Sequence, residues 1–253
     1  MGDLNLVESY ASQSSAYADA FAVFLAHTDQ KVKARAWLDR LVQCLPQRRV
    51  FIDAGAGNGA VTGWFTDAFE RTIAIEPSES LRRQLLQRCP AVEALGDFIL
   101  TAKPAAPGDL ILCSHVFYHI DTAQWLDHVQ HMASWLAPAG TLVVALQNHS
   151  ADGMRMLEHF HGQRFDLSAL ARRFEAIHGD HYRVQLETVP ASVVTQDIAT
   201  ACTIAEFFLN DLPMRKPIRR ADVEAYVRAH FSAPGGSFRF SCDQDFLQVR
   251  QRH

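Results

Sequence analysis

The residues with the clearest chemical potential lie between positions 53 and 76. Asp53 ends a short apolar run, three glycines follow at alternate positions, and a second apolar run occupies residues 60–69. Glycine adopts backbone angles that other residues avoid and lets a ligand approach the main chain, while a helix start offers free N–H groups. The pattern predicts a buried strand over residues 50–53, a turn that cradles a nucleotide-like ligand, and a helix over residues 60–69. The alternative is a tight strand-to-helix connection without a ligand.

The spacing of the glycines favours one kind of ligand. Gly55, Gly57 and Gly59 follow the pattern G-x-G-x-G. Dinucleotide folds use G-x-G-x-x-G, and a P-loop needs a Lys-Ser or Lys-Thr pair after its last glycine, which this turn lacks. A turn without Lys or Arg suits a methionine–sulfonium ligand, which carries no phosphate, better than a phosphate-bearing one.

A second acidic residue stands about 20 residues beyond the glycine turn. Residues 71–75 predict a strand that ends at Glu76 and Pro77, and Ser78 is expected to cap a helix that ends at Arg88. A carboxylate at the end of the second strand can accept hydrogen bonds from both ribose hydroxyls. Glu76 is therefore the predicted ribose ligand.

Two further strand ends carry candidate residues. Residues 91–95 predict a weak third strand, after which Asp97 can accept from an adenine amino group while Phe98 packs on the ring; the alternative is a simple turn. Residues 109–116 predict a buried fourth strand, and ligands of open parallel sheets meet the carboxyl ends of the strands. The segment from Ser114 to His119 is therefore expected to face the site.

His115 is the predicted orienting group or general base, because a neutral imidazole suits proton abstraction from a hydroxyl or a protonated nitrogen. The alternative is a packing or solvent-facing histidine. A metal site at His115, His119 and Asp121 is disfavoured, so none is expected.

Strands and helices alternate between residues 50 and 147, which predicts an α/β fold with a doubly wound, mostly parallel sheet. Further helices are expected over residues 14–25, 31–45, 122–136, 152–160, 167–178, 197–209 and 221–231, and further strands over 141–147, 182–195 and 237–250. These elements complete a seven-stranded sheet with a helical cap. We expect a single domain over residues 1–253. Its core at about 47–148 would bind the nucleotide-like ligand as a cofactor, and a cap from 8–45 and 151–235 would bind the acceptor, a second small molecule.

Composition narrows the class of protein. Hydrophobic residues make up 48% and charged residues 21% of the 253 residues, as in ordinary soluble proteins. The net charge of -4 argues against nucleic acid as a partner, and no basic run suggests a membrane surface. Five scattered cysteines without C-x-x-C indicate reduced thiols. Without a signal pattern, we expect a cytoplasmic protein that is a monomer or a homodimer.

The glycine turn, Glu76-Pro77-Ser78, Gly96-Asp97 and Leu-Ala-Pro-Ala-Gly at residues 136–140 together resemble the core of class I S-adenosylmethionine (SAM)-dependent methyltransferases. The resemblance implies SAM as cofactor and S-adenosylhomocysteine (SAH) as product. The residues expected to hold the cofactor are Asp53, Gly55, Ala56, Gly57, Glu76, Pro77, Asp97, Phe98 and Ser114.

Residues 17–27 (YADAFAVFLAH), together with Glu76-Pro77-Ser78 and residues 116–119 (VFYH), are similar to histamine N-methyltransferase. The similarity implies a small-molecule methyl acceptor bound beneath the N-terminal and C-terminal helices. Tyr17 is expected to take part in catalysis beside His115. The expected acceptor-binding residues are Tyr17, Phe21, Gln30, His115, Tyr118, His119 and Phe207.

Gln30 stands where that family places a Glu that holds the substrate amine. An amide removes the charge pairing for an ammonium ion, so a less cationic or heteroaromatic acceptor is expected. Methyl transfer to nitrogen is the favoured function, while an O-, S- or C-methyltransferase and a non-catalytic SAM-binding sensor or partner protein remain open. A nucleic-acid methyltransferase is disfavoured by the charge and by the lack of an Asn/Asp-Pro-Pro-aromatic sequence.

Overall fold

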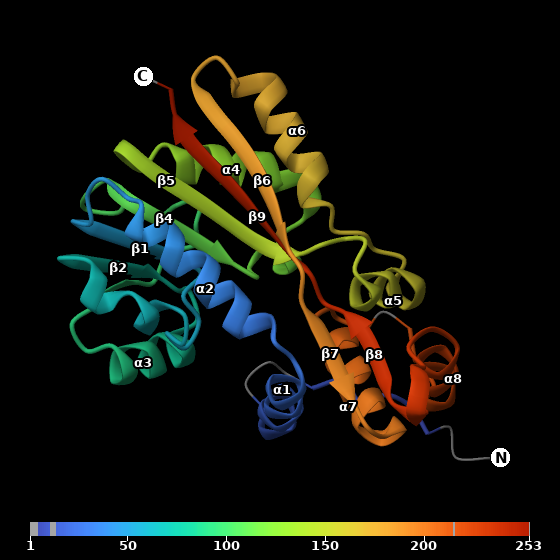
Figure 1. Cartoon of the computed structure of the whole chain (residues 1–253). Coiled ribbons are helices and arrows are strands. Elements are labelled where there is room, and N and C mark those ends of the chain that lie inside the picture. Colours follow the sequence, from blue (N-terminus) through green and yellow to red (C-terminus); the bar gives the residue numbers. More distant parts are fainter. Residues whose placement is uncertain (1–4, 11–13, 215, 253) are drawn as a thin grey trace. The chain divides into compact units, whose positions relative to one another are not determined.

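Figure 1 shows the computed structural model, which describes residues 5–10, 14–214 and 216–252. The chain forms two compact units. Unit 1 comprises Met1–Ala34, Gln147–Phe165 and Val189–Gln244, and unit 2 comprises Arg35–Leu146, Asp166–Thr188 and Asp245–His253.

Unit 2 is built on a seven-stranded sheet with the order β3-β2-β1-β4-β5-β9-β6. β1 pairs in parallel with β2 and β4, β2 with β3, and β4 with β5. The predicted seven-stranded, mostly parallel α/β sheet is therefore confirmed. Its strands are β1 (Val50–Ala54), β2 (Arg71–Ile75), β3 (Glu93–Leu95), β4 (Gly108–Ser114), β5 (Leu136–Gln147), β6 (Tyr182–Val189) and β9 (Gln244–Gln251).

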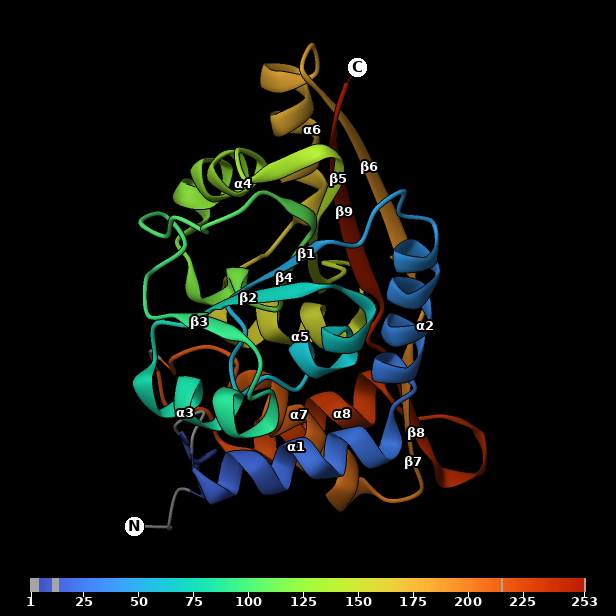
Figure 2. The same cartoon turned by 90° about the vertical axis from the view of Figure 1, so that its left-hand side faces the viewer.

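The core of unit 2 lies on both faces of this sheet, as expected where parallel strands are apolar throughout. Every residue of β1 is buried, and Phe51 contacts the rings of Phe65 and Phe69. The rings of Trp37 and Phe246 stack at 4.2 Å. Figure 2 shows α2 and α4 on opposite sides of the sheet. The helices are α2 (Gln30–Gln43), α3 (Glu79–Arg88), α4 (Trp125–Ala133) and α6 (Leu167–His178).

Unit 1 packs helices on a short antiparallel sheet of β7 (Ser192–Thr195) and β8 (Phe238–Ser241). Its core holds Phe24, Phe207 and Phe208, whose rings lie 5.2–5.9 Å apart. The helices are α1 (Ser15–His27), α5 (Asp152–His161), α7 (Ile198–Leu209) and α8 (Arg220–His230). Ser14 caps α1 by accepting a hydrogen bond from the Tyr17 N–H.

Two predicted strands are each divided in the structure. The segment 182–195 breaks into β6 and β7 at Pro190, which has no N–H to donate to a sheet, and 237–250 breaks into β8 and β9. The two breaks are joined: the Ala191 N–H donates to Asp243 Oδ1 at 2.9 Å, and the Cys242 N–H donates to the Ala191 carbonyl. Each half therefore pairs in a different sheet.

The start of β5 also differs from the prediction. The helix predicted for 122–136 is a 3-10 turn (Thr122–Gln124) followed by α4, and β5 already begins at Leu136. Its register against β4 shifts after Gly108. A Cβ at Gly140 would lie 2.5 Å from the Gly108 carbonyl oxygen, so the close approach of the two backbones requires glycine. Pro138, Ala139 and Gly140 thus bend the strand rather than precede it.

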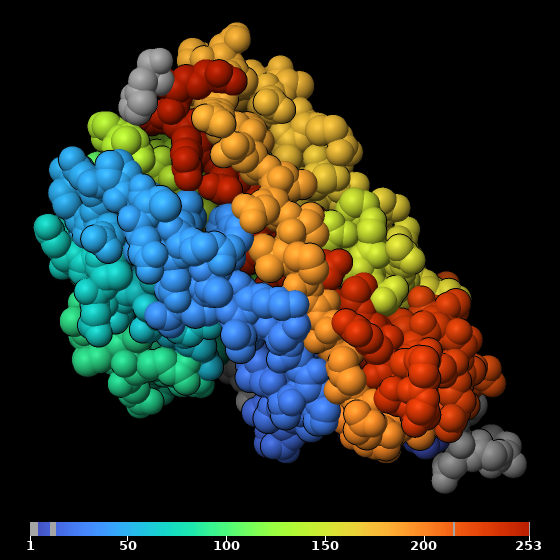
Figure 3. All heavy atoms as spheres, in the orientation of Figure 1, coloured from blue at the N-terminus to red at the C-terminus, as the bar shows by residue number. Residues whose placement is uncertain are grey.

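β6 is an edge strand of the sheet. Most of its side chains are exposed, and Figure 3 shows its residues as an orange strip along the visible surface. None of the helices in the described residues is long and apolar enough to cross a membrane.

Candidate functional site

The glycine loop follows β1 and is tied to the end of β2. The N–H groups of Gly55 and Ala56 both donate to the Ile75 carbonyl, at 2.8 and 3.0 Å. Gly55 has φ 86°, and a Cβ there would lie 2.3 Å from Cγ2 of Val116. Only glycine both tolerates this positive φ and leaves room for the Val116 side chain. The hydrogen bonds place the loop directly beside Glu76, which follows Ile75.

The Glu76 carboxylate is hydrogen-bonded to the glycine loop. Oε2 accepts a hydrogen bond from the Gly57 N–H at 2.9 Å, and Oε1 accepts one from the Ser78 N–H at 2.8 Å. The residue is only 7% exposed. Arg82 donates to the carbonyl oxygens of Glu76 and Pro77, which holds the turn before α3. Two backbone donors therefore fix one acidic group at the carboxyl edge of the sheet.

Asp53 is buried under the same loop. The Thr62 hydroxyl donates to its Oδ2 at 2.6 Å. Burial raises the pKa of Asp53 to about 7; the hydrogen bond from Thr62 opposes this rise and the charge of Glu76 adds to it. Asp53 is therefore partly protonated near neutral pH.

The helix predicted for residues 60–69 is wrong: the structure has two 3-10 turns, Thr62–Trp64 and Thr66–Ala68. Val61, Thr62 and Gly63 have low helix propensity, and the bond from Thr62 to Asp53 holds the segment against β1. Gly59, with φ 78°, packs so closely on α3 that a Cβ would lie 2.6 Å from Leu85 Cδ1. The expected helix N-terminus at the loop is therefore absent from this described segment.

The end of β4 carries the predicted catalytic residue. Ser114 is the last residue of the strand and pairs with Ala145, whose carbonyl also accepts from the His115 N–H at 2.9 Å. His115 has φ 59°, which is uncommon for a residue with a side chain. Its ring lies 5.9 Å from that of Tyr118. The left-handed backbone thus redirects the chain as it leaves the sheet.

His119 follows on the same turn (Phe117–His119). Desolvation lowers its pKa, while the charge of Glu76 acts in the opposite direction. The two effects leave His119 a neutral imidazole at neutral pH.

Asp97 and Phe98 follow β3, as predicted. The Phe98 side chain is 71% exposed, and its carbonyl accepts from the N–H groups of Thr101 and Ala102. The backbone is therefore fixed while the ring faces solvent. Together with the glycine loop, Glu76 and the end of β4, this turn belongs to unit 2.

The predicted acceptor residues of α1 and α7 form one aromatic cluster in unit 1. The Tyr17 ring lies 5.4 Å from Phe207 and 6.1 Å from Phe21, and Phe21 lies 5.6 Å from Phe207. Desolvation, followed by the charges of Asp211 and Tyr10, raises the pKa of Tyr17 to about 12. Its hydroxyl stays protonated at neutral pH.

Gln30 has a different environment from that of the aromatic cluster. It is 2% exposed, and its side-chain Nε2 donates to the Cys242 carbonyl at 2.9 Å. The Thr28 hydroxyl donates to the Ser192 carbonyl, so this turn is bound to the β7–β8 region. The Gln30 amide therefore has a structural partner within unit 1.

The sequence analysis missed four residues at these places. Thr62 donates to Asp53 and Val116 packs beside Gly55, two of the predicted cofactor residues, and only the three-dimensional structure reveals these contacts. The charge of Asp211 acts on Tyr17, and Lys31 and Asp211 act on each other: desolvation raises the pKa of Asp211 to about 7 and lowers that of Lys31, each opposed by the other's charge. For Asp211 the sequence offered one signal, namely that this acidic residue lies between Leu209 and Leu212.

Metal ligands do not gather at the site. Among residues 5–10, 14–214 and 216–252 no group of three His, Cys, Asp or Glu side chains could hold an ion.

Comparison with known proteins identifies the family. Residues 25–185 match the model of the methyltransferase domain family, which is well over half of the chain. An uncharacterized methyltransferase of Alkaliphilus oremlandii is 27% identical over 94 residues, and one of Bacillus pumilus is 28% identical over 104 residues. These alignments cover 37% and 40% of this chain, but only 44% and 49% of the relatives. The chain therefore spans about half the length of the curated relatives.

Solved structures share the fold. A putative methyltransferase of Bacillus halodurans superposes with a TM-score of 0.63 at 11% identity, over 85% of this chain and 97% of the other. The N-methyltransferase NodS of Bradyrhizobium japonicum, in complex with SAH, gives 0.57 at 15% identity over 95% and 100%. With the matched domain, the parallel sheet and the carboxylate held beside a glycine loop, the chain belongs to the class I SAM-dependent methyltransferases.

Proposed function

We propose that this chain transfers the methyl group of SAM to a nitrogen of a small molecule, an amine or a heteroaromatic metabolite. The observation that best supports it is the buried Glu76 carboxylate, fixed by the N–H groups of Gly57 and Ser78 at the carboxyl edge of the sheet. When bound, SAM supplies an electrophilic methyl group on a sulfonium. The protein has to supply binding, alignment and an acceptor nitrogen with a free lone pair.

The residues at the carboxyl edge fit SAM. Each oxygen of the Glu76 carboxylate accepts one backbone hydrogen bond and keeps a lone-pair direction for a ribose hydroxyl. The exposed ring of Phe98 is available to stack on adenine. Gly57 leaves open space where a Cβ would stand, so a ligand can approach its backbone. The residues proposed to hold the cofactor are Asp53, Gly55, Ala56, Gly57, Glu76, Pro77, Asp97, Phe98 and Ser114.

His115 is proposed as the residue that orients the acceptor or removes its proton. It stands at the end of β4, the edge to which Asp53 and Glu76 also belong. Tyr118 and the neutral His119 lie on the following turn and would bind the acceptor. An imidazole that is neutral at neutral pH can accept a proton from an ammonium group.

Tyr17, Phe21 and Phe207 are proposed to bind the acceptor. Aromatic faces attract flat rings and cationic nitrogen. Because the pKa of Tyr17 is raised to about 12, its phenol would donate a hydrogen bond rather than act as a base. The likeness of residues 17–27 to histamine N-methyltransferase supports nitrogen as the acceptor atom.

The position of Asp211 changes the class of acceptor that we expect. Gln30 brings no charge and its Nε2 is engaged with Cys242, whereas Asp211 exerts its negative charge on Tyr17. An ammonium group beside Asp211 would favour its ionised form and lower its raised pKa. Asp211 therefore restores the possibility of a cationic amine that Gln30 alone argues against.

A panel of acceptors tests this proposal. The purified chain is incubated with methyl-labelled SAM and a primary amine, an imidazole, a phenol and a thiol, and SAM binding is measured by calorimetry. Labelled amine or imidazole is the expected product. Label on the phenol or thiol alone would favour the O- or S-methyltransferase reading. Firm SAM binding without turnover on any acceptor would favour a non-catalytic SAM-binding protein.

A further inference from the structure

The edge strand β6 is long and open. It spans eight residues, Tyr182–Val189, most of whose side chains are exposed. β3, the strand at the other edge of the sheet, has three residues, and its Glu93 is paired with Arg71. An edge strand presents a row of backbone N–H and C=O groups to which another strand can pair. β6 is therefore the edge at which this sheet can be extended.

Two contacts fix the register of β6 against its neighbour β9. The Arg252 N–H donates to the His181 carbonyl at 2.8 Å, and the Thr188 hydroxyl donates to Asp245 Oδ1 at 2.7 Å. Both contacts fit a single antiparallel register, in which residue numbers rise along β6 by the same step as they fall along β9. His181 thus lies opposite Arg252, and Thr188 lies opposite Asp245.

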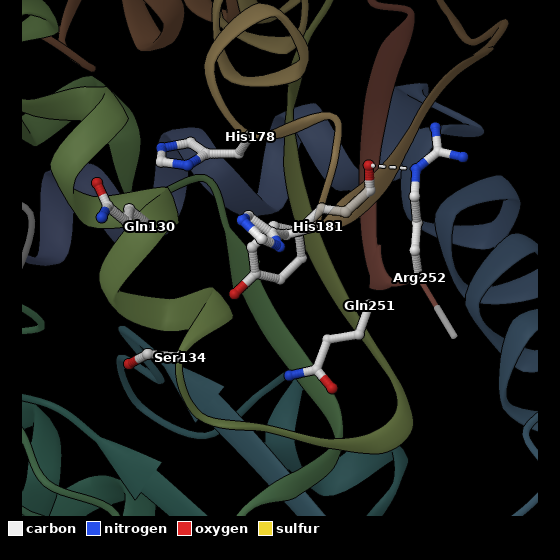
Figure 4. Close-up of a pocket in the computed structure, with 7 residues that line it drawn as sticks. Gln130, Ser134, His178, His181, Gln251 and Arg252 are labelled. Carbon is white, nitrogen blue, oxygen red and sulfur yellow. Dashed lines mark hydrogen bonds between the residues drawn. The ribbon is translucent and has the colours of Figure 1, made fainter.

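The same register decides which backbone groups of β6 face away from β9. Alternate residues of an antiparallel strand direct both backbone groups to the same neighbour. Because His181 faces β9, the odd-numbered residues of β6 face it as well, and the N–H and C=O groups of Val184 and Leu186 face the open edge. At the start of the strand, Arg252 Nε donates to the Tyr182 carbonyl at 3.3 Å, drawn dashed in Figure 4. The part of the edge left for a second strand therefore begins after Tyr182.

Three side chains of β6 form an apolar face toward α6. The ring of Tyr182 lies 5.6 Å from that of Phe174, a buried residue of α6. Val184 and Leu186 share this face, because successive side chains of a strand point to opposite sides of the sheet. Leu186 is 36% exposed, so an apolar side chain stays partly uncovered at the edge.

The other face of β6 carries one positive and one negative charge. Arg183, Gln185 and Glu187 are all exposed. Within the described part of the chain, neither charged side chain forms a hydrogen bond or an ion pair. Residues 182–189 also contain no Lys and no Pro, which commonly protect an edge strand from pairing with another chain. The two charges therefore remain for a partner strand.

A second copy of β6 complements this strand when the two run antiparallel about Gln185. Arg183 of each copy then faces Glu187 of the other, and Val184 faces Leu186 on the opposite side of the sheet. The outward backbone groups of Val184 and Leu186 meet as hydrogen-bonded pairs, which gives about four backbone hydrogen bonds. A shift of two residues in either direction places Gln185 opposite a charged residue and breaks both ion pairs.

We propose that β6 is a homodimer interface, at which a second copy of this chain pairs antiparallel and continues the sheet across a two-fold axis. An interface of this symmetry has to be self-complementary. The order of positive, apolar, amide, apolar and negative side chains over residues 183–187 meets this requirement. The interface is small, so the dimer is weak and concentration-dependent rather than obligate. It uses none of the residues proposed to bind SAM or the acceptor and is independent of the proposed function.

Small-angle X-ray scattering tests the proposal by measuring the mass of the full chain from about 10 μM to about 1 mM, the range of weak association. We expect the mass to rise toward that of a dimer. Arg183→Glu and Glu187→Arg each place like charges opposite one another in both pairs, so each should weaken dimerisation about tenfold or more. Glu70→Arg reverses an exposed charge next to β2, near the other edge of the sheet, and should leave dimerisation unchanged.

A mixture of the two charge-reversed variants gives the sharpest test. Arg183→Glu carries two acids on β6 and Glu187→Arg carries two basic side chains, so an equimolar mixture brings opposite charges together again. The mixture, and the double variant with both changes, should dimerise like the wild-type chain, which a variant that fails to fold could not do.

Hydrogen exchange on the wild-type chain locates the interface without any substitution. The amide N–H groups of Val184 and Leu186 should be protected only at concentrations at which the dimer forms. The proposal would be overturned by a chain that stays monomeric up to about 1 mM, by charge reversals that leave dimerisation unchanged, or by a mixture that dimerises no better than its components.

Discussion

Glu76 Oε2 accepts a hydrogen bond from the Gly57 N–H at 2.9 Å, so the ends of β1 and β2 are joined through one carboxylate. The second oxygen is held by Ser78, at the N-cap of α3. A charged acceptor therefore organises the glycine loop before any ligand arrives, which is the kind of preorganisation that reduces the entropic cost of binding.

Glu76→Gln should weaken SAM binding about tenfold or more. The amide has one acceptor oxygen in place of two, and hydrogen bonds to a charged group contribute about 1.5–3 kcal/mol. Calorimetry measures the affinity. Glu93→Gln is the matched control, since Glu93 is an exposed partner of Arg71 on the neighbouring strand. Unchanged affinity in Glu76→Gln would remove Glu76 from the ribose role.

Gly55→Ala should destabilise the fold more than Gly162→Ala does. Both glycines have positive φ, 86° and 68°, but only at Gly55 would the new Cβ meet another group, Val116 Cγ2 at 2.3 Å. Strained backbone alone costs on the order of 1–3 kcal/mol. Urea unfolding measures both variants. In the Val116→Ala background the excess cost of Gly55→Ala should shrink, and an undiminished cost would exclude the clash as its cause.

Much of the backbone around the proposed cofactor site could be predicted because its signals are local. The apolar strands, the glycine spacing and the acid that ends β2 are each readable within a few residues of sequence. The structure placed β2 at Arg71–Ile75 and α3 at Glu79–Arg88, where the sequence predicted them. Ser78 could be predicted as a cap because its hydroxyl bonds only three residues ahead.

The rest depends on contacts between distant residues. The segment after Gly59 has apolar spacing typical of a helix, but Thr62 bonds to Asp53 and the helix does not form. Pro190 divides one predicted strand because Asp243, far along the chain, accepts from the next residue's N–H.

The pKa of Asp53 predicts a pH dependence of stability. Its value in the folded chain is about 7, above the ordinary 3.8, so the folded state binds this proton more tightly than the unfolded chain. The contribution is fully present below about pH 4 and is lost as the pH rises through about 7, with roughly 1.4 kcal/mol for each unit of pKa difference as the upper limit.

Asp53→Asn should therefore flatten the decline of unfolding free energy between pH 4 and 7. Asparagine keeps the shape and can still accept from the Thr62 hydroxyl. Urea unfolding at several pH values compares the variant with the wild-type chain. A decline of equal slope in both proteins would show that another group titrates in this range.

His115→Ala should lower turnover more than SAM affinity if the imidazole orients the acceptor or removes its proton. The left-handed backbone at φ 59° complicates the comparison, because a change in local strain also follows the substitution. His115→Asn is the control, since asparagine tolerates this conformation better than alanine. Equal loss of turnover in both variants would implicate the ring, and an equal fall of SAM affinity and turnover would contradict a catalytic role.

Tyr17→Phe and Asp211→Asn test the acceptor residues separately. Tyr17→Phe keeps the ring contacts with Phe21 and Phe207 but removes the hydroxyl, so it should raise the KM for the acceptor by a few-fold, with SAM affinity unchanged.

Asp211→Asn removes the charge that acts on Tyr17 and should lower the pKa of the phenol. If the acceptor binds as an ammonium ion, Asp211→Asn raises KM for a cationic amine about tenfold and leaves KM for a neutral heteroaromatic acceptor unchanged. Asp222→Asn, an exposed acid paired with Arg219 on α8, is the control for the loss of one negative charge from unit 1. The same rise in KM for both acceptor types would mean that Asp211 supports the fold of the aromatic cluster rather than the charge of the substrate.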